Sequence, residues 1–98
     1  MERGGCVYIM ANSFNTVFYT GVTSDLHGRV WQHKNNEFPN SFTSRYKCYK
    51  LVYYASFFGI EEAINEEKRI KGGSRQQKID LIVALNPNWI DLYEELDK

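Results

Sequence analysis

The stretch YTGVTSDLHGR, residues Tyr19–Arg29, joins two different local patterns. Its first half continues a β-branched and aromatic run that begins at Val17, which is typical of a strand. Its second half contains Thr23 and Ser24, residue types that often cap helices, and then apolar residues at helical spacing. The stretch therefore predicts a strand that leads directly into a short helix.

The elements on either side complete an α+β domain. A second apolar run, CVYIM at Cys6–Met10, precedes the turn-forming residues ANSFNT, so the two runs predict a β-hairpin. A four-residue loop at Asn12–Asn15 would make paired residue numbers sum to 27 and place Tyr8 opposite Tyr19. The remaining expected elements are an irregular loop with one helical turn, a third strand at Cys48–Phe57, a helix ending at Gly72 and Gly73, a helix capped by Ser74, and a last short helix that buries Trp89, Leu92 and Leu96. The order ββαβααα predicts a three-stranded antiparallel sheet flanked by helices.

Length and composition indicate one soluble domain. The 98 residues suffice for a single core, and no apolar run approaches the roughly 20 residues that span a membrane. We therefore expect a cytoplasmic protein without a membrane partner, with Cys6 and Cys48 reduced. The net charge is zero, but its distribution is uneven. Residues 1–78 hold 11 Lys and Arg against 7 Asp and Glu, a net of +4, whereas residues 79–98 hold 1 against 5.

Glu67 is a carboxylate on the apolar side of a helix. The apolar residues Ile60, Ile64 and Ile70 cluster on one face when residues are placed about 100° apart, and Glu67 lies at its centre. A carboxylate aimed at a core is costly unless something pairs with it. Either Lys71, one turn later, forms an ion pair with Glu67, or the carboxylate binds a divalent cation. The pattern alone does not choose between them.

The short helix and the hairpin carry further polar residues that face the core. Arg29 and His33 are one turn apart beside the apolar stripe, so both should reach toward the sheet. Arginine suits phosphate, and histidine moves protons near neutral pH. Tyr8, Tyr19 and Gly21 are expected on one face of the hairpin. A glycine in a strand commonly marks the close approach of a ligand or of a second backbone.

These residues resemble a known family. VYI, followed about ten residues later by YTG, then TSDLHGRVWQH and EEKRIK, resembles the GIY-YIG nuclease domain, and more closely its small stand-alone bacterial subfamily. The resemblance covers nearly the whole of residues 1–98 and includes the segments NPNW and DLY. Tyr8 matches the tyrosine of the first motif, Tyr19 and Gly21 match the second motif, and Arg29 matches the arginine of the helix. His33 corresponds to the histidine one turn later in many members.

The resemblance implies a phosphodiesterase that uses one divalent ion, Mg²⁺ or Mn²⁺, with Glu67 as its metal ligand. It implies that Arg29 holds a phosphate oxygen and that Tyr8, aided by Tyr19 or His33, orients or deprotonates the attacking water. A phenol with a pKa near 10 is a base at neutral pH only if the metal or Arg29 lowers that value.

The expected substrate is nucleic acid, DNA rather than RNA. Cations on two consecutive helices and in the loop before the third strand are candidates for phosphate contacts: Lys71, Arg75, Lys78, Arg45 and Lys47. A protein partner could supply specificity. The alternative function is a binding module that keeps the fold but cuts nothing. A third possibility, a purely structural interaction protein, leaves Tyr8, Tyr19, Arg29 and Glu67 unexplained. An endonuclease is the favoured prediction.

Overall fold

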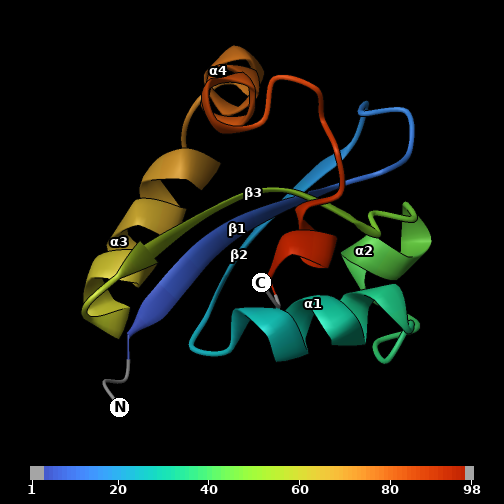
Figure 1. The fold of residues 1–98 in the computed structure, drawn as a ribbon, viewed down its shortest axis with the longest axis horizontal. Coiled ribbons are helices and arrows are strands. Elements are labelled where there is room, and N and C mark those ends of the chain that lie inside the picture. Colours follow the sequence, from blue (N-terminus) through green and yellow to red (C-terminus); the bar gives the residue numbers. More distant parts are fainter. Residues whose placement is uncertain (1–3, 97–98) are drawn as a thin grey trace.

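Within residues 4–96, which the computed structural model describes, an antiparallel sheet of three strands forms the centre of the fold (Figure 1). β1 (Gly5–Ala11) is the central strand, with β2 (Phe18–Thr23) on one side and β3 (Lys50–Phe57) on the other. The helices are α1 (Leu26–Lys34), α2 (Phe42–Arg45), α3 (Ile60–Lys71), α4 (Arg75–Leu85) and the 3₁₀ helix η1 (Leu92–Glu95). The predicted α+β class and order of elements are confirmed, and α2 is the helical turn expected in the loop before β3.

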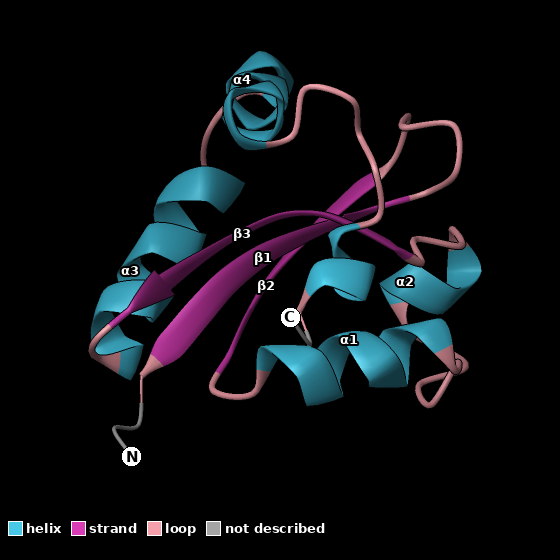
Figure 2. Ribbon diagram, viewed as in Figure 1, coloured by secondary structure: helices cyan, strands magenta, loops and turns pink. Residues whose placement is uncertain are grey.

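Helices cover both faces of the sheet (Figure 2). α3 and α4 lie over the face on which Val7, Ile9 and Ala11 of β1 are fully buried. α1, α2 and η1 lie over the other face, where Tyr8 and Met10 are fully buried. Successive side chains of a strand point to opposite faces, so β1 contributes to both layers. Tyr8 is thus a tyrosine inside a core, and its hydroxyl needs a buried partner. Among residues 4–96, none of the helices has the length and apolar character needed to cross a membrane.

The register of the hairpin differs from the predicted one. Tyr8 pairs with Gly21 and not with Tyr19, so paired residue numbers sum to 29 instead of 27. The loop is longer because the Asn12 side chain closes it, accepting hydrogen bonds from the backbone N–H groups four and five residues later at 2.8 and 3.0 Å. A shift of two residues leaves every side chain on its predicted face. Tyr8, Tyr19 and Gly21 therefore still share one face.

The start of α1 also differs from the prediction. Asp25 is the N-cap, and its Oδ1 accepts a hydrogen bond from the N–H of Gly28 at 3.1 Å. Thr23 and Ser24 therefore do not cap the helix. Thr23 ends β2, and its Oγ1 accepts a hydrogen bond from the N–H of Asp25 at 3.0 Å. This bond holds the turn from which α1 crosses the sheet.

β3 begins at Lys50 and not at Cys48. The N–H of Cys48 donates to the carbonyl of Thr43 at 2.8 Å, and Lys47 has a left-handed φ of 57°. The chain is therefore still leaving α2 at this point. Cys48 belongs to the core by its side chain although its backbone is outside the sheet.

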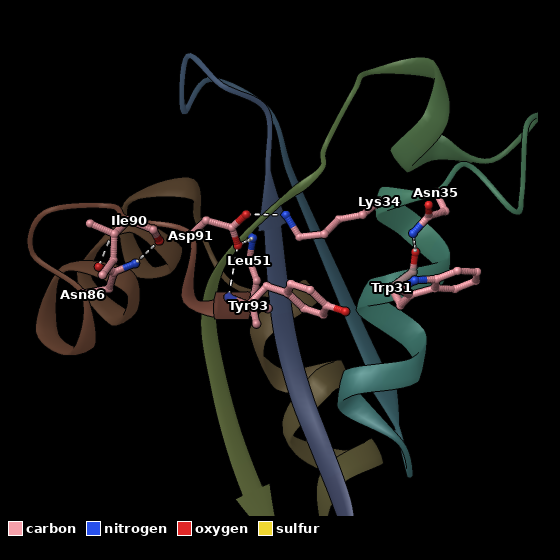
Figure 3. Close-up of polar contacts among 8 residues, drawn as sticks. All are labelled: Trp31, Lys34, Asn35, Leu51, Asn86, Ile90, Asp91 and Tyr93. Atoms are coloured by element: carbon pink, nitrogen blue, oxygen red, sulfur yellow. Dashed lines mark hydrogen bonds and ion pairs between the residues drawn. The ribbon is translucent and has the colours of Figure 1, made fainter. Parts of the chain in front are cut away.

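Asn86 connects the segment after α4 to β3 by side-chain hydrogen bonds. Its Nδ2 donates to the carbonyls of Val52 and Ile90 at 3.1 and 2.9 Å, and its Oδ1 accepts from the N–H of Ile90 at 3.1 Å. Figure 3 shows the pair of bonds with Ile90. The segment also brings Trp89, which is half-buried, onto the ring of Phe18 with 5.8 Å between centroids.

Asp91 adds a second attachment (Figure 3). Its Oδ1 accepts from the N–H groups of Leu51 and Tyr93, both at 3.1 Å, and its Oδ2 forms an ion pair with Lys34 of α1. The predicted last helix is the single 3₁₀ turn η1, in which Leu92 is buried. These contacts bring η1 and α1 together over the face that contains Tyr8.

Candidate active site

Tyr8 lies at the centre of the face covered by α1. Its side chain is fully buried, and its Oη is 3.0 Å from Nε2 of His33. Gly21, its partner on β2, lies under the ring, since a Cβ there would be 2.5 Å from Cζ and Oη of Tyr8. The glycine that the sequence places beside the tyrosines therefore makes room for the ring of Tyr8.

His33 faces Tyr8 from α1. It is 6% exposed, and its Nδ1 is 2.9 Å from Oγ1 of Thr43. Burial, and then the positive charge of Arg29, lower the pKa of His33 below its ordinary value of 6.5. The imidazole is thus uncharged near neutral pH, and one of its nitrogens can accept a proton.

Residues from three elements act on the phenol of Tyr8. Burial is the main cause that raises the pKa of Tyr8 above 10.0, and Tyr19 and Glu67 raise it further, whereas Arg29 lowers it. The ring centroid of Tyr19 is 6.3 Å from that of Tyr8. β2, α1 and α3 therefore bring Tyr19, Arg29 and Glu67 close to one hydroxyl. Arg29 alone does not overcome burial, so the phenol is protonated near neutral pH.

Glu67 reaches this place from α3, which packs against β1 and β2. Its side chain is 12% exposed, and its Oε2 lies 2.7 Å from Nζ of Lys71. The Lys71 ammonium also lies 5.9 Å from the ring centroid of Tyr19. The ion pair considered from the sequence is therefore present, and it lies beside the tyrosines. It does not decide whether Glu67 also binds a metal.

The site offers few protein ligands to a metal ion. Residues 4–96 hold no cluster of three His, Cys, Asp or Glu side chains placed to bind a metal. Mg²⁺ commonly keeps several waters and uses one or two carboxylates together with substrate phosphates. Glu67 is a hard oxygen donor of low exposure beside Tyr8, so it fits such an ion once Lys71 moves aside.

Aromatic side chains from the segment around α2 border the site. Phe42 lies 6.0 Å from the ring of Tyr19 and 4.7 Å from that of Tyr46, and Phe38 lies 6.0 Å from the ring of His33. Phe38, Phe42 and Tyr46 are each more than 40% exposed. Exposed rings beside a polar site offer stacking surfaces for bases.

Other predicted phosphate-binding cations lie apart from the Tyr8 hydroxyl. Arg45 is exposed on α2, and Lys47 lines a separate hollow formed with Lys34, Lys50 and Asp91. The guanidinium of Arg75 lies 4.6 Å from the ring of Phe18, on the opposite face of β2 from Tyr19. Lys78 donates to a backbone carbonyl in the turn between α3 and α4 at 3.0 Å. Lys71 is thus the cation of this predicted set that lies within the site.

Thr43 is a site residue that the sequence analysis did not select. It is 2% exposed and bonded to His33, although it stands in a polar segment that reads as a loop. Ser41, the N-cap of α2, is the one local signal for the turn that buries it. Nothing in the residue pattern shows that Thr43 faces a histidine ten positions earlier.

Comparisons with known proteins identify the family to which the sequence is similar. Residues 4–80 match the family model described as the GIY-YIG catalytic domain, a range that includes every residue at the site. A UPF0213 protein from Staphylococcus haemolyticus is 34% identical over 76 residues, 78% of this chain and 90% of that protein. A UPF0213 protein from Staphylococcus saprophyticus is 36% identical over 64 residues, 65% of this chain and 77% of that protein.

A solved structure shows the same fold. The solution NMR structure of a UPF0213 protein from Bacillus halodurans superposes with a TM-score of 0.57 at 26% sequence identity. The similarity covers 90% of this chain and 92% of the other. The sheet and its surrounding helices are therefore shared along almost the whole chain.

Proposed function

The chain belongs to the GIY-YIG catalytic domain family, a family of nuclease domains, and we propose that it is a metal-dependent endonuclease that hydrolyses phosphodiester bonds in DNA. The observation that supports this most is the meeting of His33, Arg29 and Glu67 around the hydroxyl of Tyr8. These residues combine a proton-transfer pair, a permanent cation and a carboxylate. Each of these functions can accelerate the hydrolysis of a phosphate diester.

The side chains take distinct parts in the reaction. Arg29 holds a non-bridging oxygen of the scissile phosphate as negative charge develops there. Tyr8 contacts the attacking water and accepts its proton, with His33 or Tyr19 assisting. The phenol can do so only while its own proton is taken by a neighbour, because its pKa lies above 10.0. His33, uncharged and 3.0 Å away, is the neighbour placed for this.

Glu67 would hold one divalent ion, Mg²⁺ or Mn²⁺, which when bound stabilises charge on the phosphate and the leaving oxygen. Lys71 must release Glu67 before the carboxylate can serve as a ligand. Lys71 can then turn toward a phosphate of the substrate, since its side chain is 52% exposed.

The nucleic acid would be bound by charge and stacking. Lys and Arg contacts with phosphates carry no sequence information, so a preference for DNA structure fits this chain better than a preference for sequence. Phe42 and Phe38 border the site and can stack on bases. Such an activity would serve repair or recombination, with a protein partner adding specificity.

Cleavage of a panel of DNA structures tests the proposal. The purified chain is incubated with supercoiled plasmid, branched DNA and single-stranded DNA in Mg²⁺ or Mn²⁺. Arg29→Ala should abolish cleavage, while Arg69→Ala should not, because Arg69 pairs with Glu66 on the exposed side of α3. No cleavage by the wild type, or equal rates for the two variants, would contradict it.

A second function is a nucleic-acid or protein binding module that retains the fold without cutting. The Glu67–Lys71 ion pair and the raised pKa of Tyr8 favour it, because both oppose the charged forms that catalysis needs. Titration with Mg²⁺ or Mn²⁺ followed by NMR distinguishes the two. Unperturbed resonances around Glu67, together with DNA-induced shifts at Arg29, would support the binding module over the nuclease.

A further inference from the structure

Thr43 lies within a series of hydrogen bonds that leads to Tyr8. Its Oγ1 lies 2.9 Å from Nδ1 of His33 and 3.0 Å from Oγ of Ser41. The Ser41 oxygen also accepts a hydrogen bond from the N–H of Ser44 at 3.3 Å. The chain therefore runs from Ser41 through Thr43 and His33 to Tyr8, and its last three members are each no more than 6% exposed.

The backbone around Thr43 holds the hydroxyl in place. The carbonyl of Thr43 accepts from the N–H of Cys48 at 2.8 Å, and the N–H of Ser41 donates to the carbonyl of Phe38 at 3.0 Å. A valine would fill the same volume, so packing alone does not require a hydroxyl here. The oxygen is explained by the nitrogen of His33 that it meets.

The donors and acceptors determine the direction of these hydrogen bonds. The phenol of Tyr8 keeps its proton near neutral pH, and Arg29 beside it can only donate. Of the side chains that hydrogen-bond to Tyr8 within residues 4–96, Arg29 can only donate, so the phenol donates its proton to Nε2 of His33, which accepts it. A neutral imidazole has one N–H, which must then be on Nδ1 and point at Thr43. Thr43 can pass its own proton toward Ser41.

We propose that Thr43 is a positioning residue that holds His33 in the tautomer protonated on Nδ1, which leaves Nε2 free to take the proton of Tyr8. This inference rests on the proposed nuclease function. It assigns His33 and not Tyr19 as the group that assists Tyr8. It also gives a role to α2, whose position determines where the hydroxyl lies.

The proton transfer balances as follows. The oxygen of the attacking water forms a bond to phosphorus, and the bond from phosphorus to the leaving oxygen breaks. The water proton passes to Oη of Tyr8 while the original Tyr8 proton passes to Nε2 of His33. The imidazolium donates from Nδ1 to Thr43 throughout, so the accepting oxygen stabilises its charge. His33 then returns the proton to solvent or to the leaving oxygen.

Two matched substitutions separate the hydroxyl from the shape of Thr43. Thr43→Val removes the acceptor and keeps the volume, whereas Thr43→Ser keeps the acceptor. Both are made in a His27→Gln background, which leaves His33 as the single histidine of the chain. The ring ¹⁵N shifts of the protein without metal or DNA then report the tautomer directly, and the cleavage rate on DNA is measured in parallel.

We expect the background protein and Thr43→Ser to show one tautomer protonated on Nδ1, and Thr43→Val to show a mixture or the other tautomer. Cleavage by Thr43→Val should fall by about 10- to 100-fold, with Thr43→Ser within about 3-fold of the background protein. A background protein protonated on Nε2 overturns the inference even if Thr43→Val fails to fold. An active Thr43→Val with unchanged tautomer and rate also overturns it, while the nuclease function stands. If the wild type binds DNA without cutting it, the proposed function fails, and the ¹⁵N spectra still decide whether Thr43 sets the tautomer.

Discussion

Replacing Gly21 by alanine tests whether the ring of Tyr8 lies across β2 as the fold requires. The new Cβ would be 2.5 Å from Cζ and Oη of Tyr8. Carbon contacts favour about 3.5 Å, so the ring must move by about 1 Å. Because the ring is fully buried, this overpacking should cost about 1–3 kcal/mol. Loss of the hydrogen bond to His33 adds about 1 kcal/mol. We therefore expect the free energy of unfolding to fall by about 2–4 kcal/mol.

Urea unfolding followed by circular dichroism measures this change. Gly72→Ala is the matched control, because a Cβ there meets its nearest atom at 3.4 Å and the backbone is in the right-handed helical region. The effect should also nearly vanish in a Tyr8→Leu background, where the ring is absent. If Gly21→Ala is as stable as Gly72→Ala, Tyr8 does not lie over Gly21 and the geometry of the site is wrong.

Three further predictions concern pH, metal binding and the C-terminal attachment. Burial and the nearby guanidinium of Arg29 lower the pKa of His33 in the folded state, so the unfolded chain binds the proton more readily. The free energy of unfolding should therefore fall as the pH drops below about 6.5. Unfolding titrations should show this part of the pH dependence lost in His33→Gln, and a dependence shared by both proteins would contradict it. Lys71→Gln removes the cation paired with Glu67, so Mn²⁺ binding measured by calorimetry should tighten by about 2- to 5-fold, whereas weaker binding would show that Lys71 does not compete with the ion. Asn86→Ala removes three side-chain hydrogen bonds and should lower the free energy of unfolding, measured with urea, by about 2–4 kcal/mol. The substitution of the exposed Asn88 by alanine should change it little. Equal effects of the two substitutions would argue against the attachment.

Local patterns were sufficient to predict the order of elements. β-branched and aromatic runs marked the three strands, and the Ser74 cap marked the start of α4. The faces of Arg29, His33 and Glu67 also followed from helical spacing. Tyr8 and Tyr19 kept their shared face although the register was wrong by two residues, because side chains alternate with a period of two.

The features that the sequence did not predict depend on which side-chain contact forms among several that the residue types allow. Asn12 lengthens the hairpin loop through hydrogen bonds that an Asn-rich turn does not specify in advance. Asp25 caps α1 because Thr23 is used by the turn before it. Thr43 is buried only because α2 folds back onto His33. A residue pattern reports the face of an element, but it does not report which side chain from another element will lie opposite.

The central claim is that Glu67 acts in catalysis at the Tyr8 site. The most direct measurement is the DNA cleavage rate in Mn²⁺ of Glu67→Gln compared with Glu66→Gln. Both substitutions neutralise one carboxylate on the same turn of α3, but Glu66 pairs with Arg69 away from the site. We predict that Glu67→Gln loses at least about 100-fold in rate while Glu66→Gln stays within a few-fold of the wild type. Equal rates for the two variants would contradict the claim.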